Sequence, residues 1–282
     1  MALAMKRLFG VSYLYDMDSS MAEQIIEKYP ASRVLGRWLR WSEGLAIRHA
    51  EAVVPVCDAL AQIASRYRPK RLVVLRDISL LSRNGQPLPS SSSVKRDLSL
   101  SGPIVMYVGN LERYQGIDLL LESFAIAHRR IPTACLVIIG GQPAHLRHYQ
   151  REAQARGLAH AVHFLGPRPV AQMADYLEAA DILVSPRLAG GNTPMKIYSY
   201  LDAGKAVLAT ALPTHTQLLT DEVAMLKPPT PEAFADGLVQ LLEDHSLRQR
   251  LGQAGRALVA QRHTYPVYQR TLHGLYASLD PT

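Results

Sequence analysis

A short stretch with the sequence NTPMK has the residue types that bind a phosphate group. Asn192 or Thr193 can act as the N-cap of a helix, and Pro194 suits the first turn because it has no N–H group that would lack a partner there. The amides of Met195 and Lys196 would then point outward at the positive end of the helix dipole. The Lys196 ammonium adds a full positive charge, so the stretch predicts a diphosphate site; the alternative is an ordinary capped helix with a solvated lysine.

The elements that would position this site repeat along most of the chain. From residue 102 onward, short apolar runs alternate with amphipathic helices, which is the pattern of βαβ units in a parallel sheet. The runs are apolar on both faces, as buried parallel strands are. They are PIVMYVG, ACLVIIGG, AVHFLG, DILVSP, AVLAT and VAML, and helices are expected near 117–128, 144–156, 170–179, 195–203 and 214–220. The predicted fold class is α/β, with a doubly wound, Rossmann-like parallel sheet and a helical C-terminal third.

Ligands of such sheets bind outside the carboxyl ends of the strands, so the loops that follow the strands are the place to look. The loop GNLERYQG follows the first run and has a glycine at each end, which lets the backbone approach a ligand. The dipeptide GG follows the second run, and the tripeptide GPR, with Gly166 and Arg168, follows the third. Arg187, after the fourth run, either reaches a phosphate or pins its own loop.

The first 68 residues contain only about two predicted strands, VSYLYDMD and AVVPVC, with helices from Met21, over 33–50 and over 58–67. Two strands are too few for an independent α/β domain. We therefore expect an incomplete N-terminal α/β segment over 1–68, a ligand-binding domain over 69–262 with an exposed Ser/Pro loop at 85–96, and a C-terminal helix over 263–282.

The predicted helix over 33–50 alternates Trp38 and Trp41 with arginines. Such a helix could press on anionic lipid at the inner face of a membrane. We favour the alternative, in which the helix packs its aromatic side chains on the sheet.

Composition narrows the class of partner. The formal net charge of +7 favours a polyanion, a membrane surface or a phosphorylated substrate, but no recognition motif accompanies the charge, so we expect no nucleic acid. Cys57 and Cys135 have no second cysteine nearby, which predicts a reducing, cytoplasmic compartment. The sequence has no run of about 18 apolar residues, so we expect no membrane-spanning helix. We expect surface positions and no metal site for two histidine pairs with three-residue spacing, which are His145 with His148 and His160 with His163.

As a set, YVGNLERYQGIDLLLESF, HFLG and ADILVSPRLAGGNTPMKIYSYLDAGKAVLAT resemble the retaining, family-4 glycosyltransferases of the GT-B fold, and the resemblance covers about residues 11–282. It implies that this part of the chain holds a UDP- or GDP-sugar donor and needs no metal or other cofactor. It also implies hexosyl transfer to a glycan or lipid-linked acceptor, in polysaccharide biosynthesis, with the acceptor bound on an N-terminal Rossmann half.

The resemblance also assigns roles to residues that differ from the family pattern. Asn110 and Gln115 stand where family members have an arginine and a lysine that clamp the diphosphate. Ser199 and Gly191 stand where two glutamates contact the donor, and Ser199 could still donate to a ribose hydroxyl. Asp18 stands about where a histidine lies near the reacting centre, which makes it the catalytic candidate; the alternative is a helix N-cap or turn residue.

Two functional hypotheses follow. The first is a retaining glycosyltransferase; the second is a non-catalytic nucleotide-sugar-binding subunit, or an inactive fragment of such an enzyme, that works with a separate acceptor-domain chain. The predicted donor-binding residues are Gly109, Asn110, Arg113, Gln115, Gly166, Arg168, Arg187, Asn192, Thr193, Pro194, Met195, Lys196 and Ser199.

Overall fold

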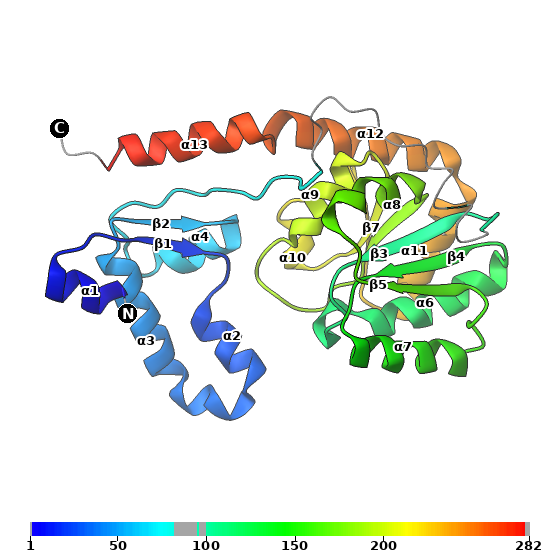
Figure 1. The fold of residues 1–282 in the computed structure, drawn as a ribbon, viewed down its shortest axis with the longest axis horizontal. Coiled ribbons are helices and arrows are strands. Elements are labelled where there is room, and N and C mark those ends of the chain that lie inside the picture. Colours follow the sequence, from blue (N-terminus) through cyan, green and yellow to red (C-terminus); the bar gives the residue numbers. More distant parts are fainter. Residues whose placement is uncertain (1, 82–94, 96–99, 280–282) are drawn as a thin grey trace. The chain divides into compact units, whose positions relative to one another are not determined.

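The computed structural model describes residues 2–81, 95 and 100–279, which form two compact units (Figure 1). The first unit comprises 1–77, 191–193 and 265–282, and the second comprises 78–190 and 194–264. The predicted loop at 85–96 lies outside the described residues except for Lys95. The C-terminal helix, which we expected to follow the second domain as a separate segment, belongs to the first unit.

The first unit contains a two-stranded parallel sheet in which Leu14 lies opposite Ala52, and Val53 also bridges to Leu72. The first helix was not predicted; it is held by Lys6, whose ammonium donates to the carbonyl oxygen of His49. The elements are α1 (Ala2–Phe9), β1 (Leu14–Met17), α2 (Met21–Lys28), the 3-10 helix η1 (Pro30–Leu35), α3 (Gly36–His49), β2 (Ala52–Pro55), α4 (Asp58–Ser65) and α13 (Tyr265–Ala277).

The core of the first unit covers both faces of β2. Val53 packs with Ile47 and Leu60 on one face. Ala52 and Val54 pack on the other face with Leu275 of α13, which explains why the C-terminal helix belongs to this unit. Burial of a leucine side chain contributes about 1.5–3 kcal/mol, a large share of the stability of so small a core.

The orientation of α3 differs from our expectation: Trp38 and Trp41 do not pack on the sheet, and each is 61% exposed. The buried stripe of α3 includes Glu43, Gly44 and Ile47 instead. Gly44 lies against the Tyr67 ring, where an added Cβ would come within 2.3 Å of a ring carbon. Because this stripe includes a carboxylate and a glycine, an apolar pattern points to the wrong face of the helix.

The second unit is built on a six-stranded parallel sheet with the strand order β5-β4-β3-β6-β7-β8. The order reverses between β3 and β6, which makes that junction the switch point of a doubly wound sheet and confirms the predicted fold class. The strands are β3 (Ile104–Val108), β4 (Cys135–Ile139), β5 (Val162–Gly166), β6 (Ile182–Ser185), β7 (Ala206–Thr210) and β8 (Met225–Lys227).

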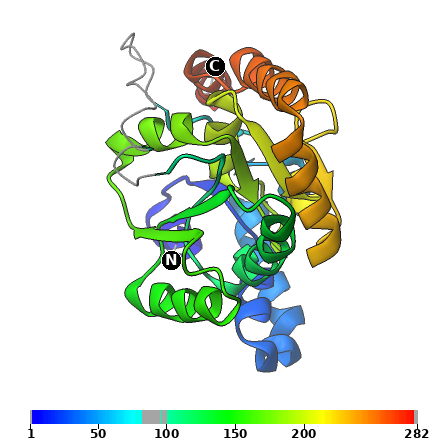
Figure 2. The ribbon, with the colours of Figure 1, turned by 90° about the vertical axis from the view of Figure 1, so that its right-hand side faces the viewer.

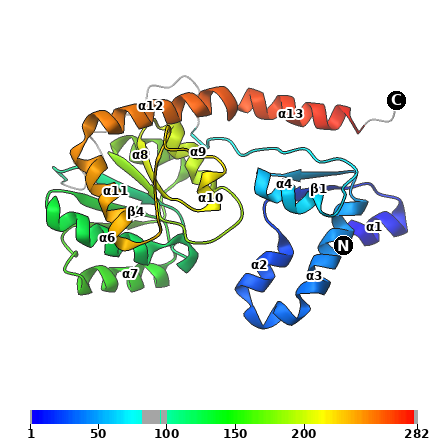
Figure 3. The same ribbon diagram turned by 180° about the vertical axis from the view of Figure 1, so that it is seen from behind.

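Helices cover both faces of this sheet (Figures 2 and 3). One face packs on α6, α7 and α11 through residues such as Phe124, Tyr149 and Phe234, and the other on α8, α9 and α12 through Leu177, Leu201 and Val259. The elements are the 3-10 helices η2 (Arg113–Gln115) and η3 (Val170–Gln172), and the helices α6 (Ile117–Arg130), α7 (Pro143–Ala155), α8 (Met173–Ala179), α9 (Met195–Asp202), α10 (Pro213–Thr216), α11 (Pro231–Glu243) and α12 (His245–Arg262). Within the described ranges, no helix is both long enough and apolar enough to cross a membrane.

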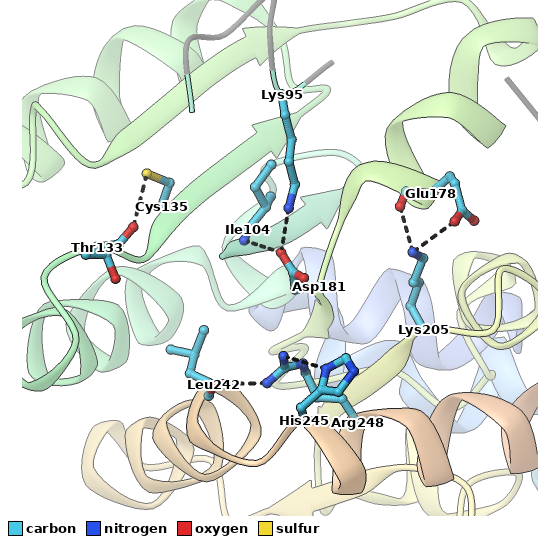
Figure 4. Close-up of polar contacts among 10 residues, drawn as sticks. All are labelled: Lys95, Ile104, Thr133, Cys135, Glu178, Asp181, Lys205, Leu242, His245 and Arg248. Carbon is cyan, nitrogen blue, oxygen red and sulfur yellow. Dashed lines mark hydrogen bonds and ion pairs between the residues drawn. The ribbon is translucent and has the colours of Figure 1, made fainter. Parts of the chain in front are cut away.

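Polar contacts fix the end of the sheet where the strands begin (Figure 4). Asp181, just before β6, accepts from the Ile104 amide of β3 at 2.8 Å and from the Lys95 ammonium at 3.2 Å. Lys205, just before β7, donates to the Glu178 carbonyl oxygen at 2.6 Å. These contacts align the strand starts, and the loops at the opposite, carboxyl edge remain for a ligand site.

The close approach of α12 to the turn before β7 gives a stability prediction. A Cβ added at Gly252 would lie 2.2 Å from the Gly204 carbonyl oxygen, which is backbone and cannot move aside cheaply. We expect Gly252→Ala to lower the free energy of unfolding by about 1–3 kcal/mol, measured by urea unfolding followed by circular dichroism. Gln253→Ala, at the next and exposed position of the same helix, should change it by less than about 0.5 kcal/mol. Equal stability of the two variants would contradict the close packing.

Candidate functional site

The carboxyl edge of the sheet is built from two glycine loops stacked on each other. The Gly109 amide donates to the Ile139 carbonyl oxygen at 2.9 Å, and the Gly140 amide donates to the Gly166 carbonyl oxygen at 2.8 Å. Gly140 has φ +107°, and a Cβ there would lie 2.1 Å from the Gly109 carbonyl oxygen. Both the backbone conformation and the close contact therefore require glycine at this position.

Helix α9 begins at Met195, as the predicted range 195–203 has it, but its N-cap differs from the prediction. Pro194 is itself the N-cap, with extended backbone at φ −64° and ψ 129°, and it makes no side-chain cap hydrogen bond. The predicted capping by Asn192 or Thr193 is therefore wrong, because the proline takes the position where their side chains would act. Met195 and Lys196 are the first two helical residues, and N–H groups at these positions have no acceptor inside a helix.

The side chain of Lys196 turns back to the loop after β3. Its ammonium donates to the Gln115 amide oxygen at 3.1 Å and lies 4.0 Å from the centre of the Tyr107 ring. A Cβ at Gly109 would lie 3.0 Å from this ammonium. The structure thus brings together Gly109, Gln115 and Lys196, three of the predicted donor-binding residues, at the end of the central strand.

The surroundings of Lys196 disfavour its charge. Desolvation, followed by repulsion from Arg187, lowers the pKa of Lys196 from 10.5 to about 7. None of the ion pairs of the described residues involves Lys196. The sequence suggested a solvated or phosphate-bound cation, and the structure has a half-buried lysine whose ammonium contacts protein groups and has no carboxylate partner among those described.

Arg187 is buried and held by its own loop. Its Nε donates to the Ala189 carbonyl oxygen at 2.6 Å, and the guanidinium lies 5.3 Å from the centre of the Tyr114 ring. Gly190, at φ +117°, leaves room for the guanidinium, because a Cβ there would lie 2.0 Å from it. Two roles were predicted for Arg187, contact with a phosphate or stabilisation of its own loop. These contacts show the second.

A buried polar network supports this loop from below. The Thr210 hydroxyl donates to the Arg187 carbonyl oxygen at 2.6 Å and lies 3.0 Å from His215 Nδ1. His215 Nε2 lies 2.9 Å from the Ser185 hydroxyl at the end of β6. Desolvation lowers the pKa of His215 from 6.5 to about 4, so the ring is neutral at physiological pH. The sequence did not indicate these supporting residues, since their contacts join separate segments.

Four other predicted residues are either exposed or hydrogen-bonded to groups other than Lys196. Arg113 and Arg168 are exposed. The backbone carbonyl oxygen of Asn110 accepts from the Tyr107 hydroxyl at 2.6 Å, and the buried Ser199 hydroxyl accepts from the Leu80 amide at 3.1 Å. The proposed contact of Ser199 with a ribose hydroxyl remains a prediction.

Asp18, in the first unit, is not the N-cap of α2. Ser20 is the N-cap and accepts from the Glu23 amide at 3.3 Å, while Asp18 lies in the exposed bend after β1. The carboxyl groups of Asp16 and Asp77 lie near Asp18. Desolvation, followed by the charges of Asp18 and Asp16, raises the pKa of Asp77 to about 6. Asp77 is the acidic residue that the sequence analysis missed at this edge of β1.

Among the described residues, which include both histidine pairs, no group of three or more potential metal ligands is found. His148 and His160 are exposed, as expected. His145 and His163 are half-buried, which corrects the expected surface positions, because α7 and β5 direct them inward. His160 Nε2 lies 3.2 Å from His128 Nε2.

The buried His215 gives a prediction for acid stability. Between about pH 6.5 and pH 4 the unfolded chain binds a proton that the folded ring does not, so the free energy of unfolding falls as the pH falls through this window. We expect His215→Asn, which cannot titrate, to be less stable at pH 7 but to lose less stability between about pH 7 and pH 5, measured by urea midpoints. The exposed control His273→Asn should keep the slope of the parent protein, and a parental slope in His215→Asn would contradict the assignment.

Comparison with known proteins places this geometry in context. The sequence matches the family described as glycosyl transferases group 1 over residues 92–258. It is 30% identical over 205 residues to the phosphatidyl-myo-inositol mannosyltransferase of Mycobacterium tuberculosis, covering 70% of this chain and 53% of that protein. It is 27% identical over 163 residues to the D-inositol 3-phosphate glycosyltransferase of Corynebacterium diphtheriae, covering 56% of this chain and 38% of that protein. The chain thus spans about half the length, or less, of these curated relatives.

Solved structures share the fold. Sucrose-phosphate synthase from Thermosynechococcus elongatus superposes with a TM-score of 0.81 at 22% identity, covering 98% of this chain and 70% of that one. Anabaena Alr3699/HepE in complex with UDP-glucose superposes with a TM-score of 0.79 at 15% identity, covering 98% of this chain and 75% of that one. At these identities the likeness establishes the α/β fold of the GT-B type. With the family match over more than half of the residues, it follows that the chain belongs to the glycosyl transferases group 1 family.

Proposed function

We propose that this chain transfers a hexosyl unit from a UDP- or GDP-sugar to a glycan or lipid-linked acceptor, and that its second unit binds the donor. The observation that carries the proposal is the Lys196 ammonium at the carboxyl end of the central strand, beside Gly109 and at the N-terminus of α9. A half-buried cation and outward amides together match a diphosphate. The names of the relatives support glycosyl transfer, and the HepE complex supports a nucleotide sugar as donor.

The contact between Lys196 and Gln115 explains how the site can work without the usual clamp. Gln115 stands where the family resemblance expects a lysine, yet its amide oxygen lies 3.1 Å from the Lys196 ammonium. We infer that α9 supplies the positive charge that Gln115 lacks. The neutral Gln115 would then orient this ammonium through its amide oxygen.

The same cation would act on the reaction. When the bond between sugar and diphosphate breaks, negative charge develops on the departing diphosphate. Lys196 and the helix dipole of α9 would stabilise that charge more strongly than they stabilise the bound donor, which lowers the barrier. The groups around the ammonium are Tyr107, Gln115 and Arg187, so we propose neutralisation by side chains, without a metal or other cofactor.

The finer features are carried by the sequence resemblance. We propose that transfer retains the anomeric configuration, as in family-4 enzymes, and that the acceptor binds to the part of the protein that includes residues 1–68. Asp18 remains the catalytic candidate on that side. The raised pKa of Asp77, about 6, makes this neighbouring carboxyl a second candidate for proton transfer, because a group of such pKa can both accept and give a proton near neutral pH.

A non-catalytic nucleotide-sugar-binding subunit, paired with a separate acceptor-domain chain, is the second candidate function. The neutral residues Asn110, Gln115 and Ser199 favour it, because they supply no charge where the family resemblance expects arginine, lysine and glutamate. Release of labelled sugar from a nucleotide sugar, to water or to acceptor, distinguishes the two functions. Tight donor binding with no release would support the second.

We further propose that the first unit contacts the inner, cytoplasmic face of a membrane through an aromatic patch formed by Val34, Leu35, Trp38 and Trp41. All four side chains are more than half exposed, although they are apolar. Arg37, exposed on the same turns of helix, adds the positive charge that anionic headgroups attract. A lipid-linked acceptor would be reached from this position.

The donor site gives a binding prediction. A hydrogen bond to a charged group contributes about 1.5–3 kcal/mol, so Lys196→Ala should weaken binding of UDP or GDP by about 10- to 150-fold in calorimetric titration. The matched control is Lys205→Ala, which removes a lysine paired with Glu178 at the opposite edge of the sheet and should leave the affinity unchanged (Figure 4). Binding of neither nucleotide by the parent protein at millimolar concentration, or equal affinities in the parent and Lys196→Ala, would remove the site from the argument.

The aromatic patch gives a second prediction with an internal probe, because Trp38 and Trp41 are the two tryptophans of the chain. Their fluorescence should shift to shorter wavelength with vesicles that contain anionic phospholipid. Trp38→Ser should weaken flotation with these vesicles by about tenfold or more, since burial of a large apolar side chain contributes about 1.5–3 kcal/mol. The control Tyr276→Ser removes an exposed aromatic residue of α13 and should bind like the parent. An unchanged emission spectrum would argue against contact.

A further inference from the structure

The Lys196 ammonium contacts groups that do not compensate its positive charge while no ligand is bound. The ammonium lies over the Tyr107 ring of β3 at 4.0 Å and donates to the uncharged Gln115 of η2 at 3.1 Å. Neither partner carries a negative charge to compensate for lost hydration. Lys196 is half-buried, and a partly dehydrated ammonium with such partners is costly, so that loss of its proton relieves the cost.

The titratable groups that face this ammonium from the neighbouring elements reinforce the cost. Arg187, after β6, is positive and repels it. His215 of α10 is close enough for the two charges to disfavour each other, and its ring is neutral above about pH 4. The Tyr107 hydroxyl is neutral, because burial raises its pKa above the ordinary value. Every neighbouring charge in the described part of the site is therefore zero or positive.

We propose that Lys196 is only partly charged in the free protein and becomes fully charged when a diphosphate occupies the site, so that donor binding takes up a proton from solution. The identity of the anion rests on the proposed function. The proton passes from the buffer to the Lys196 amine, and no bond of the donor forms or breaks. Gln115 is then a positioning residue, since its oxygen accepts from the nitrogen in either charge state.

The pKa of Lys196, lowered to about 7, sets the expected size of the effect. With the bound-state pKa returned to its ordinary range, binding should take up about half a proton at pH 7 and about nine-tenths at pH 8. Affinity should fall about fivefold between these two values, because only the protonated amine binds well.

Calorimetric titration with UDP-glucose and with GDP-mannose tests the proposal. The diphosphate of a nucleotide sugar is a diester without a group that titrates near neutrality, whereas a terminal phosphate has a second pKa of about 6 and would release protons of its own. Titrations at pH 8 in HEPES and in Tris, which differ in heat of ionisation, report the number of protons taken up. The matched variant is Lys196→Arg, whose guanidinium does not lose its proton; it should bind without uptake and without the fall in affinity.

A second measurement does not depend on any variant or ligand. The ¹³Cε resonance of Lys196 in the free parent protein should titrate near pH 7 rather than above pH 10. Binding with no proton uptake at pH 8, or a resonance that titrates above about pH 10, would overturn the inference and leave the proposed function standing. Uptake that persists in Lys196→Arg would assign the proton to another group and also overturn it. Absence of binding by either nucleotide sugar, with the resonance still titrating near pH 7, would instead overturn the proposed function.

Discussion

The site depends on one topological constraint, the place of β3 between β4 and β6 in the sheet. The chain leaves β3 and β6 toward opposite sides, so the loops after these strands diverge and expose the end of β3. Tyr107 is near that end, and its ring forms the floor on which the Lys196 ammonium lies. The Lys196 ammonium is thereby held against an aromatic ring. The carboxyl end of β3 and the N-terminus of α9 lie at the same place.

Much of this arrangement follows from local sequence pattern. Six apolar runs predicted six parallel strands, and the glycine loops and Lys196 were predicted at their carboxyl ends, because the positions of strands and of the loops that follow them depend on short-range signals. The state of Lys196 was not predictable, since the contact with Gln115 joins residues 81 positions apart and burial decides the charge. The predicted N-cap of α9 was wrong because proline can be the N-cap as well as the first helical residue.

The first unit shows a different limit of such reasoning. Trp38 and Trp41 were expected inside, but Glu43 is buried and accepts from the Ser20 hydroxyl and the Met21 amide, both at 2.7 Å. Once hydrogen-bonded, a carboxylate can occupy a core position that composition would give to an aromatic residue. Buried polar networks of this kind, here and around His215, are invisible to hydrophobic periodicity although they determine which face of a helix is left for other molecules.

The packing of α13 on β2 has a consequence for how the chain acquires its structure during translation. Leu275 completes the hydrophobic cluster of Ala52 and Val54, but the ribosome adds it only after the whole of the second unit. The second unit has all of its strands beforehand, so it can fold while one face of β2 still lacks its cover. The cluster on this face of β2 is therefore completed only after the second unit has been synthesised, although β2 itself precedes that unit in the sequence.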